Sequence, residues 1–149
     1  MMKRGKQRGG CACACTCLRR AARAVTQLYD EAFRRMGYRV TQVGVLSALA
    51  EMGPVTVSRL AEETVTDRTT LTRNLQLLKK KDLVCLETGK DKRERRVCIT
   101  PRGERVLRQT QPEWASVQSG VIRRMGRKRF ERFMEDLSEV IKAAREGCC

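Results

Sequence analysis

Cysteine is the residue type with the most chemistry to offer in this chain, which has 149 residues, eight of them cysteines and none of them histidines. Four thiols alternate with small residues near the N-terminus, at Cys11, Cys13, Cys15 and Cys17. This spacing differs from that of a zinc finger, but thiols two residues apart can chelate a soft metal or metalloid ion or react with an oxidant. We interpret the tract as a candidate thiol sensor. The alternative is a set of reduced thiols that do no chemistry.

The absence of histidine excludes several kinds of site. No Ser-His-Asp triad, Cys-His pair or imidazole metal ligand can be built from this chain. The sequence also lacks a Cys-x-x-Cys motif, so no catalytic constellation can be assembled. We therefore expect a protein that is not an enzyme and requires no cofactor, with a soft metal or metalloid at the cysteines as the one candidate ligand. A thiol-based redox or metalloid-handling protein is the least favoured alternative.

Basic side chains concentrate between residues 67 and 96, where ten Lys and Arg stand against five Asp and Glu. A helix is expected from Thr66 or Asp67 to about Lys81, with Leu71, Leu75 and Leu78 on its inner face. Its other face is polar and comprises Thr69, Thr72, Arg73, Gln76 and Lys80, with Arg68 near the N-terminal end. Arg can bind a guanine edge, Gln can pair with adenine, and hydroxyls can bind phosphates. The face suits a DNA major groove; an ordinary solvated helix is the alternative.

A β-hairpin is expected next, because two β-prone runs, Leu83–Leu86 and Val97–Thr100, flank a polar, Gly-containing stretch. Its loop carries the cations Lys90, Lys92, Arg93, Arg95 and Arg96. Such a tip suits a minor groove and its flanking phosphates, and a solvated tip is the alternative. A hairpin centred between Asp91 and Lys92 places Cys85 opposite Cys98. The pair could then form a disulfide on oxidation. The favoured interpretation is that the two small side chains pack against each other as reduced thiols without chemistry.

Helices are expected on both sides of this segment. Apolar spacing predicts a long helix from Leu18 to Met36, ended by Gly37, whose wide apolar stripe could also contact a partner chain. Thr41 is expected to cap a second helix that stops at Met52, and Thr56 a short helix from Val57 to Glu63. A further helix should start at Pro101 and be kinked or interrupted at Pro112, and a last one should start near Gly126.

Composition sets the protein class. The chain has the length of one domain, and its 32 Lys and Arg against 17 Asp and Glu give a net charge of +15. Such a charge favours a polyanionic partner, with nucleic acid as the first candidate and an anionic membrane surface as the second. No apolar run reaches the roughly 18–20 residues of a membrane span, and no secretory signal pattern is present. We expect a cytoplasmic, nucleoid-associated protein of a bacterium or archaeon that does not bind membranes. Residues 1–17 are expected to form a mobile basic arm and a Cys-rich tract, and residues 18–149 one domain.

Three stretches together resemble the MarR family of regulators. Residues 46–62 resemble the start of its DNA-binding domain, Asp67-Arg-Thr-Thr-Leu-Thr-Arg its recognition helix, and Asp91-Lys-Arg-Glu-Arg-Arg-Val-Cys-Ile-Thr-Pro-Arg-Gly its wing. The resemblance implies a mostly α winged helix-turn-helix fold with a small β-hairpin wing. Residues 41–100 would form the DNA-binding lobe, and residues 18–40 and 101–149 the dimerisation helices. The implied function is that of a homodimer that represses transcription from a palindromic double-stranded DNA operator until a small molecule, oxidant or metal releases it.

The resemblance also assigns residue roles. Arg68, Thr69, Thr70 and Arg73 fall on the reading helix, and Asp91 and Arg93 fall on the wing, where the Arg enters the minor groove. Lys92 and Arg95 join them as phosphate-binding candidates, and Thr72 and Gln76 complete the reading face. The candidate effector pocket comprises Tyr29, Phe33, Tyr38 and Trp114, with core and interface aromatics as the favoured alternative. A protein that binds nucleic acid without sequence preference is the main rival to the whole interpretation.

Zinc-sensing relatives use histidine and carboxylates, so that mode of sensing is excluded here. Peroxide-sensing relatives have a reactive cysteine near the N-terminal helix, where Cys17 is expected in the first turn and the helix dipole would favour its thiolate. In the implied dimer the N-terminal and last helices share one region. Cys148 and Cys149 would then approach the N-terminal thiols of the same or the other chain.

Overall fold

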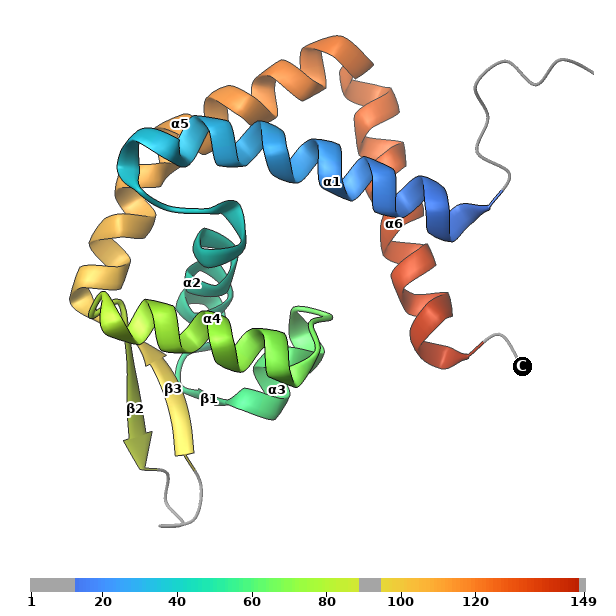
Figure 1. Cartoon of the computed structure of the whole chain (residues 1–149). Helices are drawn as coiled ribbons and strands as arrows, with labels where there is room; N and C mark the ends of the chain where they lie inside the picture. The colour runs from blue at the N-terminus through green and yellow to red at the C-terminus, as the bar shows by residue number, and fades with distance from the viewer. Residues whose placement is uncertain (1–12, 89–94, 148–149) are drawn as a thin grey trace, which may run out of the picture. The chain divides into compact units, whose positions relative to one another are not determined.

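The computed structural model describes residues 13–88 and 95–147. Within these ranges the chain forms α1 (Ala14–Phe33), the 3-10 turn η1 (Arg34–Met36), α2 (Val40–Met52), β1 (Val55–Thr56), α3 (Val57–Glu63), α4 (Arg68–Lys80), β2 (Val84–Thr88), β3 (Arg95–Ile99), α5 (Pro101–Met125) and α6 (Arg127–Glu146) (Figure 1). The predicted fold class, mostly α with a β-hairpin after a helix-turn-helix, is confirmed. The chain divides into two compact units, residues 1–110 and 111–149.

The core of the first unit lies beneath α4. Leu71, Leu75 and Leu78 are buried there, as their spacing predicted. They pack with apolar side chains of α2, α3, the sheet and the first turns of α5, namely Val45, Leu46, Leu49, Leu60, Leu83, Val84, Val97 and Val106. Because one face of α4 is fixed in this core, its opposite face must point outward.

The sheet has three antiparallel strands in the order β1-β3-β2. β2 and β3 pair in the predicted register, with Cys85 opposite Cys98. β1, which pairs Val55 with Val97, is a strand that the sequence did not predict. A strand of two residues is too short to show an alternating apolar pattern in the sequence. It forms because the fold places residues 55 and 56 beside β3.

Most helix ends follow the predicted caps. The Thr56 hydroxyl accepts a hydrogen bond from the Arg59 amide at 3.2 Å, and the Asp67 carboxylate accepts one from the Thr70 amide at 2.9 Å. The prediction that Thr41 caps the second helix is wrong, because α2 already begins at Val40. The Val40 amide donates to the Asp30 carboxylate at 2.7 Å, and the Arg39 amide donates to the Gln42 side chain at 3.2 Å. These two acceptors satisfy the first amides without a Thr cap.

The first helix also starts earlier than predicted, at Ala14 instead of Leu18. No Gly or Pro occurs between residues 13 and 33, and the Cys17 amide already donates to the Cys13 carbonyl at 3.0 Å. The helix therefore includes residues 14–17 of the predicted Cys-rich tract. At the other end, Gly37 adopts the left-handed conformation expected of a helix terminator, with φ of 72°.

α5 begins at Pro101 as predicted. Thr100 links it by hydrogen bonds to the segment that leads into the wing, the hairpin of β2 and β3. The Thr100 hydroxyl donates to the Asp82 carbonyl and accepts from the Gly103 amide, and its own amide donates to the Leu83 carbonyl. A Cβ at Gly103 would overlap that Leu83 carbonyl oxygen, so only glycine permits this approach. α5 continues through Pro112 to Met125 as one helix. Pro112 therefore does not split it into two helices.

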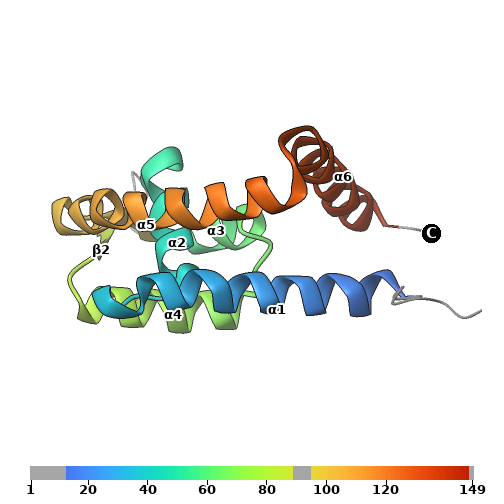
Figure 2. The same cartoon turned by 90° about the horizontal axis from the view of Figure 1, so that it is seen from above.

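The second unit contains the rest of α5 and all of α6, which follow each other at Gly126 (Figure 2). Gly126 has φ of 84° and forms the predicted start of the last helix. No residue of the 20-residue α6 is buried. Among the residues described, no helix has the length and apolar character needed to cross a membrane.

Candidate nucleic-acid interface

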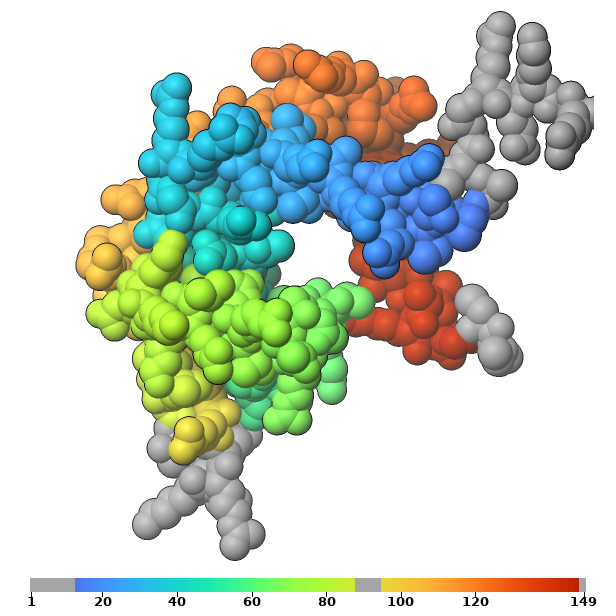
Figure 3. Space-filling model, in the orientation of Figure 1, coloured from blue at the N-terminus to red at the C-terminus, as the bar shows by residue number. Residues whose placement is uncertain are grey.

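The outer face of α4 is the centre of the candidate interface. α4 has 13 residues and is therefore roughly 20 Å long at 1.5 Å per residue. Figure 3 shows α4 at the surface of the molecule, and the predicted reading residues along it are all exposed: Arg68, Thr69, Thr70, Thr72, Arg73 and Gln76. Burial of the three leucines fixes which way these side chains point, so the sequence placed this face correctly.

Local hydrogen bonds shape what the face offers. The Thr72 hydroxyl donates to the Arg68 carbonyl at 2.7 Å, which leaves its oxygen as an acceptor and its methyl group as an apolar contact. Hydrogen bonds from the Thr70 hydroxyl and amide, with smaller contributions from the Thr69 amide and the Arg73 charge, hold the pKa of Asp67 below its usual value. Asp67 therefore remains ionised while it caps the helix, and it fixes the N-terminal turn that presents Arg68 and Thr69.

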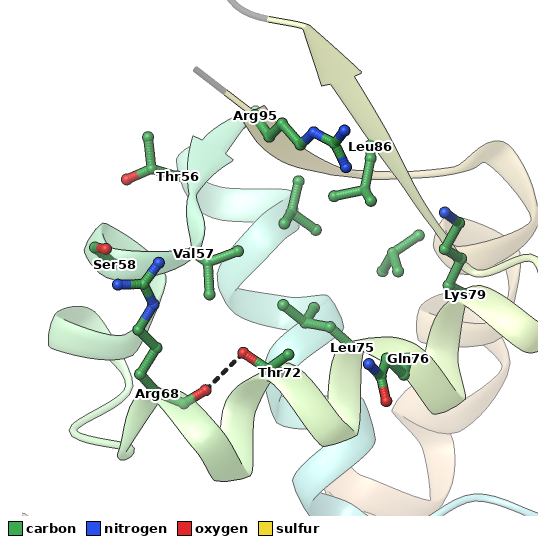
Figure 4. Close-up of a pocket in the computed structure, with 12 residues that line it drawn as sticks. Thr56, Val57, Ser58, Arg68, Thr72, Leu75, Gln76, Lys79, Leu86 and Arg95 are labelled. Atoms are coloured by element: carbon green, nitrogen blue, oxygen red, sulfur yellow. Dashed lines mark hydrogen bonds between the residues drawn. The ribbon is translucent and has the colours of Figure 1, made fainter. Parts of the chain in front are cut away.

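A groove of about 650 Å³ separates α4 from the wing (Figure 4). Its floor is apolar and comprises Val57, Leu75, Val84, Leu86 and Val97. Its edges carry Arg68, Thr72, Gln76 and Lys79 from α4, Ser58 from α3 and Arg95 from β3. The predicted site residues Arg68, Thr72, Gln76 and Arg95 are thus brought together from α4 and β3, which are separated by the 14 residues 81–94.

Three polar residues that line this groove were missed as site candidates, namely Thr56, Ser58 and Lys79. Lys79 continues the outer face of α4 three residues beyond Gln76, so helical spacing could have found it. Ser58 comes from α3, and no sequence pattern connects it to the wing.

The cations at this surface are available to a ligand. Within residues 13–88 and 95–147, no salt bridge involves Arg68, Arg73, Lys79 or Arg95, whereas Arg59 on α3 pairs with Glu62 and Glu63. Lys81 is engaged elsewhere, since its ammonium lies 4.7 Å from the centre of the Tyr38 ring and donates to the Gly37 carbonyl. The wing residues Asp91, Lys92 and Arg93 lie outside the described residues, and their predicted roles stay predictions.

The N-terminal thiols occupy the start of α1. Cys13 precedes the helix, and Cys15 and Cys17 belong to its first turn. Hydrogen bonds from the Thr16 amide and hydroxyl, followed by the Cys15 amide, lower the pKa of the exposed Cys13 thiol. Thiolate character was predicted for Cys17, but the earlier start of the helix favours it at Cys13. Cys11, Cys148 and Cys149 lie outside the described residues, so their approach to these thiols stays a prediction.

Cys85 and Cys98 form a disulfide between β2 and β3, with their Cα atoms 5.2 Å apart. The favoured interpretation, that the two thiols pack without forming a bond, is therefore wrong. The two residues stand directly opposite each other in an antiparallel ladder, and this distance is in the range that a disulfide bridges.

The four aromatic residues of the candidate effector pocket belong to two different units. In the first unit, Tyr29 and Phe33 are buried with their ring centres 6.3 Å apart, and Tyr38 packs against the core. Trp114 belongs to the second unit and is 39% exposed. A cavity of about 560 Å³ reaches Tyr38, but its other lining residues are mainly polar and come from the end of α1 and the following loop. A shared aromatic pocket stays a prediction.

Comparison with known proteins decides the family. A model of the MarR family matches residues 36–94. The transcriptional regulator MosR of M. tuberculosis, solved in complex with DNA, is 36% identical, with 90% of this chain and 97% of MosR covered and a TM-score of 0.81. This chain belongs to the MarR family. The predicted resemblance is thereby confirmed.

More distant structures share the fold of this MarR-family chain. BpsR of Bordetella bronchiseptica is 19% identical over 89% of this chain and 95% of its own, with a TM-score of 0.80. MepR of S. aureus, solved as a DNA complex, is 14% identical over 87% and 97%, with a TM-score of 0.75. A search of curated protein sequences gave no match.

Proposed function

We propose that this chain is a homodimeric transcription regulator that binds a palindromic double-stranded DNA operator and represses the genes beside it. α4 lies in the major groove, where Arg68, Arg73 and Gln76 read base edges, and the wing carries Arg95 to the phosphates and minor groove next to it. The observation that carries this proposal is the outward surface formed by α4 and Arg95, whose cations form no salt bridge among the described residues.

The similarity to MosR supports this choice, because MosR is a transcriptional regulator whose DNA complex is solved and the match spans nearly the whole of both chains. The charge supports it as well. A net charge of +15 supplies phosphate contacts whose strength must fall as salt rises.

The dimer is supported by α6. Its apolar side chains recur at helical spacing, and Phe133, Met134, Val140 and Ile141 are 39–46% exposed. Val25 and Leu28 of α1 are similarly exposed. A helix of 20 residues with none buried needs a partner to cover its apolar stripe, and a second copy of the chain is the partner that a two-fold operator requires.

Release from DNA by a signal is the last part of the proposal. Cys13, Cys15 and Cys17 at the start of α1 are the proposed site for an oxidant or a soft metal or metalloid ion, because the lowered pKa of Cys13 favours its reactive thiolate. The proposed site for a small-molecule effector includes the aromatic residues Tyr29, Phe33 and Tyr38 of the first unit. A small aromatic acid has this role in BpsR, whose DNA binding is regulated by 6-hydroxynicotinic acid.

Selection from a random-sequence duplex library tests the central proposal. The full chain, immobilised at about 0.15 M salt, should enrich one inverted repeat whose half-sites are about one helical turn apart. Enrichment of no sequence, with strong binding to every duplex, would instead support a nucleic-acid-binding protein without sequence preference.

A further inference from the structure

The disulfide between Cys85 and Cys98 lies in the wing, but neither cysteine is among the proposed DNA-contacting residues. Alternation along the strands places Val84, Leu86, Arg95 and Val97 toward the groove and α4. Cys85 and Cys98 therefore occupy the opposite face of the same ladder. The bond lies behind the DNA-reading surface and can change without removing any group that touches DNA.

We propose that Cys85 and Cys98 form a reversible thiol–disulfide modification site that sets the affinity of the wing for DNA, with the oxidised state binding more tightly. This inference rests on the proposed DNA-binding function. It is separate from the sensing proposed for the thiols at the start of α1, because the two groups of cysteines lie on different elements.

The position of the bond explains how it acts. In the ladder, Val84 opposite Ile99 precedes the cysteine pair, whereas three pairs lie beyond it toward the tip: Leu86–Val97, Glu87–Arg96 and Thr88–Arg95. β2 pairs only with β3, so its outer part is held by this ladder alone among the described residues. A covalent bond at the base of this segment fixes the register, and a register slip of one residue would turn Arg95 away from the groove.

Fixing the register lowers the cost of binding. A wing with its strands already aligned loses less conformational freedom when Arg95 meets a phosphate, so affinity rises without a new contact. Reduction removes the covalent restraint and leaves the strands held by hydrogen bonds and by the buried side chains of Val84 and Val97.

Accessibility indicates which sulfur reacts first with a peroxide. Cys85 is partly exposed, whereas Cys98 is only 6% exposed. The Cys85 thiolate attacks one peroxide oxygen, the O–O bond breaks, and a sulfenic acid and hydroxide form. The Cys98 sulfur then attacks the Cys85 sulfur, and the departing hydroxide takes up the thiol proton to leave as water. Two thiols and one hydrogen peroxide give one disulfide and two waters, and a dithiol reductant reverses the change.

Glu87 modulates this chemistry. One of its carboxylate oxygens and both sulfur atoms lie within 4.8 Å of one another. A nearby negative charge disfavours thiolate formation, so Glu87 slows oxidation of the reduced pair. Glu87→Gln should therefore raise the rate of disulfide formation with hydrogen peroxide several-fold, without changing the affinity of the fully oxidised protein for DNA by more than about two-fold.

The test uses the full chain with Cys11, Cys13, Cys15, Cys17, Cys148 and Cys149 replaced by serine, so that the wing pair alone remains. Its affinity for the duplex selected from the random library is measured after treatment with hydrogen peroxide and after treatment with dithiothreitol. The oxidised protein should bind at least three-fold more tightly. Adding Cys85→Ser should abolish this difference and leave the affinity of the reduced state.

A second measurement follows the chemistry without DNA. With Cys98→Ser in the same background, peroxide and dimedone should label residue 85, and mass spectrometry should find little label at Cys98 in the Cys85→Ser variant. Equal affinity of the oxidised and reduced proteins, or weaker binding after oxidation, would overturn the proposal. If no duplex is selected in either state while the disulfide forms and breaks normally, the proposed DNA-binding function fails instead.

Discussion

Arg73 occupies the middle of the outer face of α4, where it is exposed and has no salt-bridge partner among the described residues. A side chain in this position can reach a base edge, whereas a cation on the wing meets mainly phosphate and sugar. Arg73 is therefore expected to contribute sequence selectivity, and Arg95 is expected to contribute affinity for any DNA duplex.

Replacing Arg73 by alanine should relax preference at particular base pairs and cost about 1–3 kcal/mol on the selected operator. Arg95→Ala should weaken binding to all duplexes by a similar factor and lower the slope of log affinity against log salt by about one. Fluorescence anisotropy with single-base operator variants at several salt concentrations measures both. Arg129→Ala on α6 is the matched control, and the same sequence ranking and salt slope for all three variants would contradict the assignment.

Asp67 makes the N-terminus of α4 sensitive to acid. Its pKa is lowered in the folded protein by the Thr70 hydrogen bonds, so the carboxylate stabilises the fold above its unfolded pKa of about 3.9. This contribution is lost as the pH falls through the lower folded pKa. Between pH 5 and pH 3 the melting temperature of Asp67→Asn should therefore fall less than that of the wild type. Parallel thermal melts of the two proteins measure this, and equal losses would show that the cap carries no charge-dependent stability.

At the scale of elements, the sequence correctly predicted the features that depend on residues close together in the chain. The leucine spacing of α4, the caps at Thr56 and Asp67, and the Cys85–Cys98 register were confirmed. The errors arose where distant contacts decide. The start of α2 depends on Asp30, ten residues earlier in the chain, and β1 exists only because β3 lies beside it. Likewise, Ser58 and Arg95 line the same groove, and only the folded chain brings α3 and β3 to its two sides.

The junction between the wing and α5 leaves no room for a side chain at Gly103. Gly103→Ala should destabilise the protein by about 1–3 kcal/mol, because the added methyl group meets the Leu83 carbonyl and must displace α5 or β2. Gly44→Ala is the matched control, since its Cβ enters open space within α2 and should stabilise by about 0.5–1 kcal/mol. Urea unfolding measures both changes, and equal effects at the two glycines would refute this view of the junction.

At the scale of the whole molecule, the net charge supports the proposed DNA partner, and the exposed apolar side chains of α6 support the proposed dimer. Phe133→Glu combined with Ile141→Glu should raise the dissociation constant of the dimer at least 100-fold, because two charges would be buried without partners. Analytical ultracentrifugation measures it. Ser138→Glu, with an exposed hydroxyl on α6, serves as the control, and a wild-type chain that sediments as a monomer at micromolar concentration would contradict the dimer.

The affinity ratio between two duplexes tests sequence-specific reading by α4 and the wing most directly. The full chain is titrated at about 0.15 M salt with the selected inverted repeat and with a shuffled duplex of the same length and composition. The proposed regulator should bind the inverted repeat at least 10³-fold more tightly. Affinities that agree within two-fold would contradict sequence-specific reading and leave a protein that recognises only the charge of the DNA backbone.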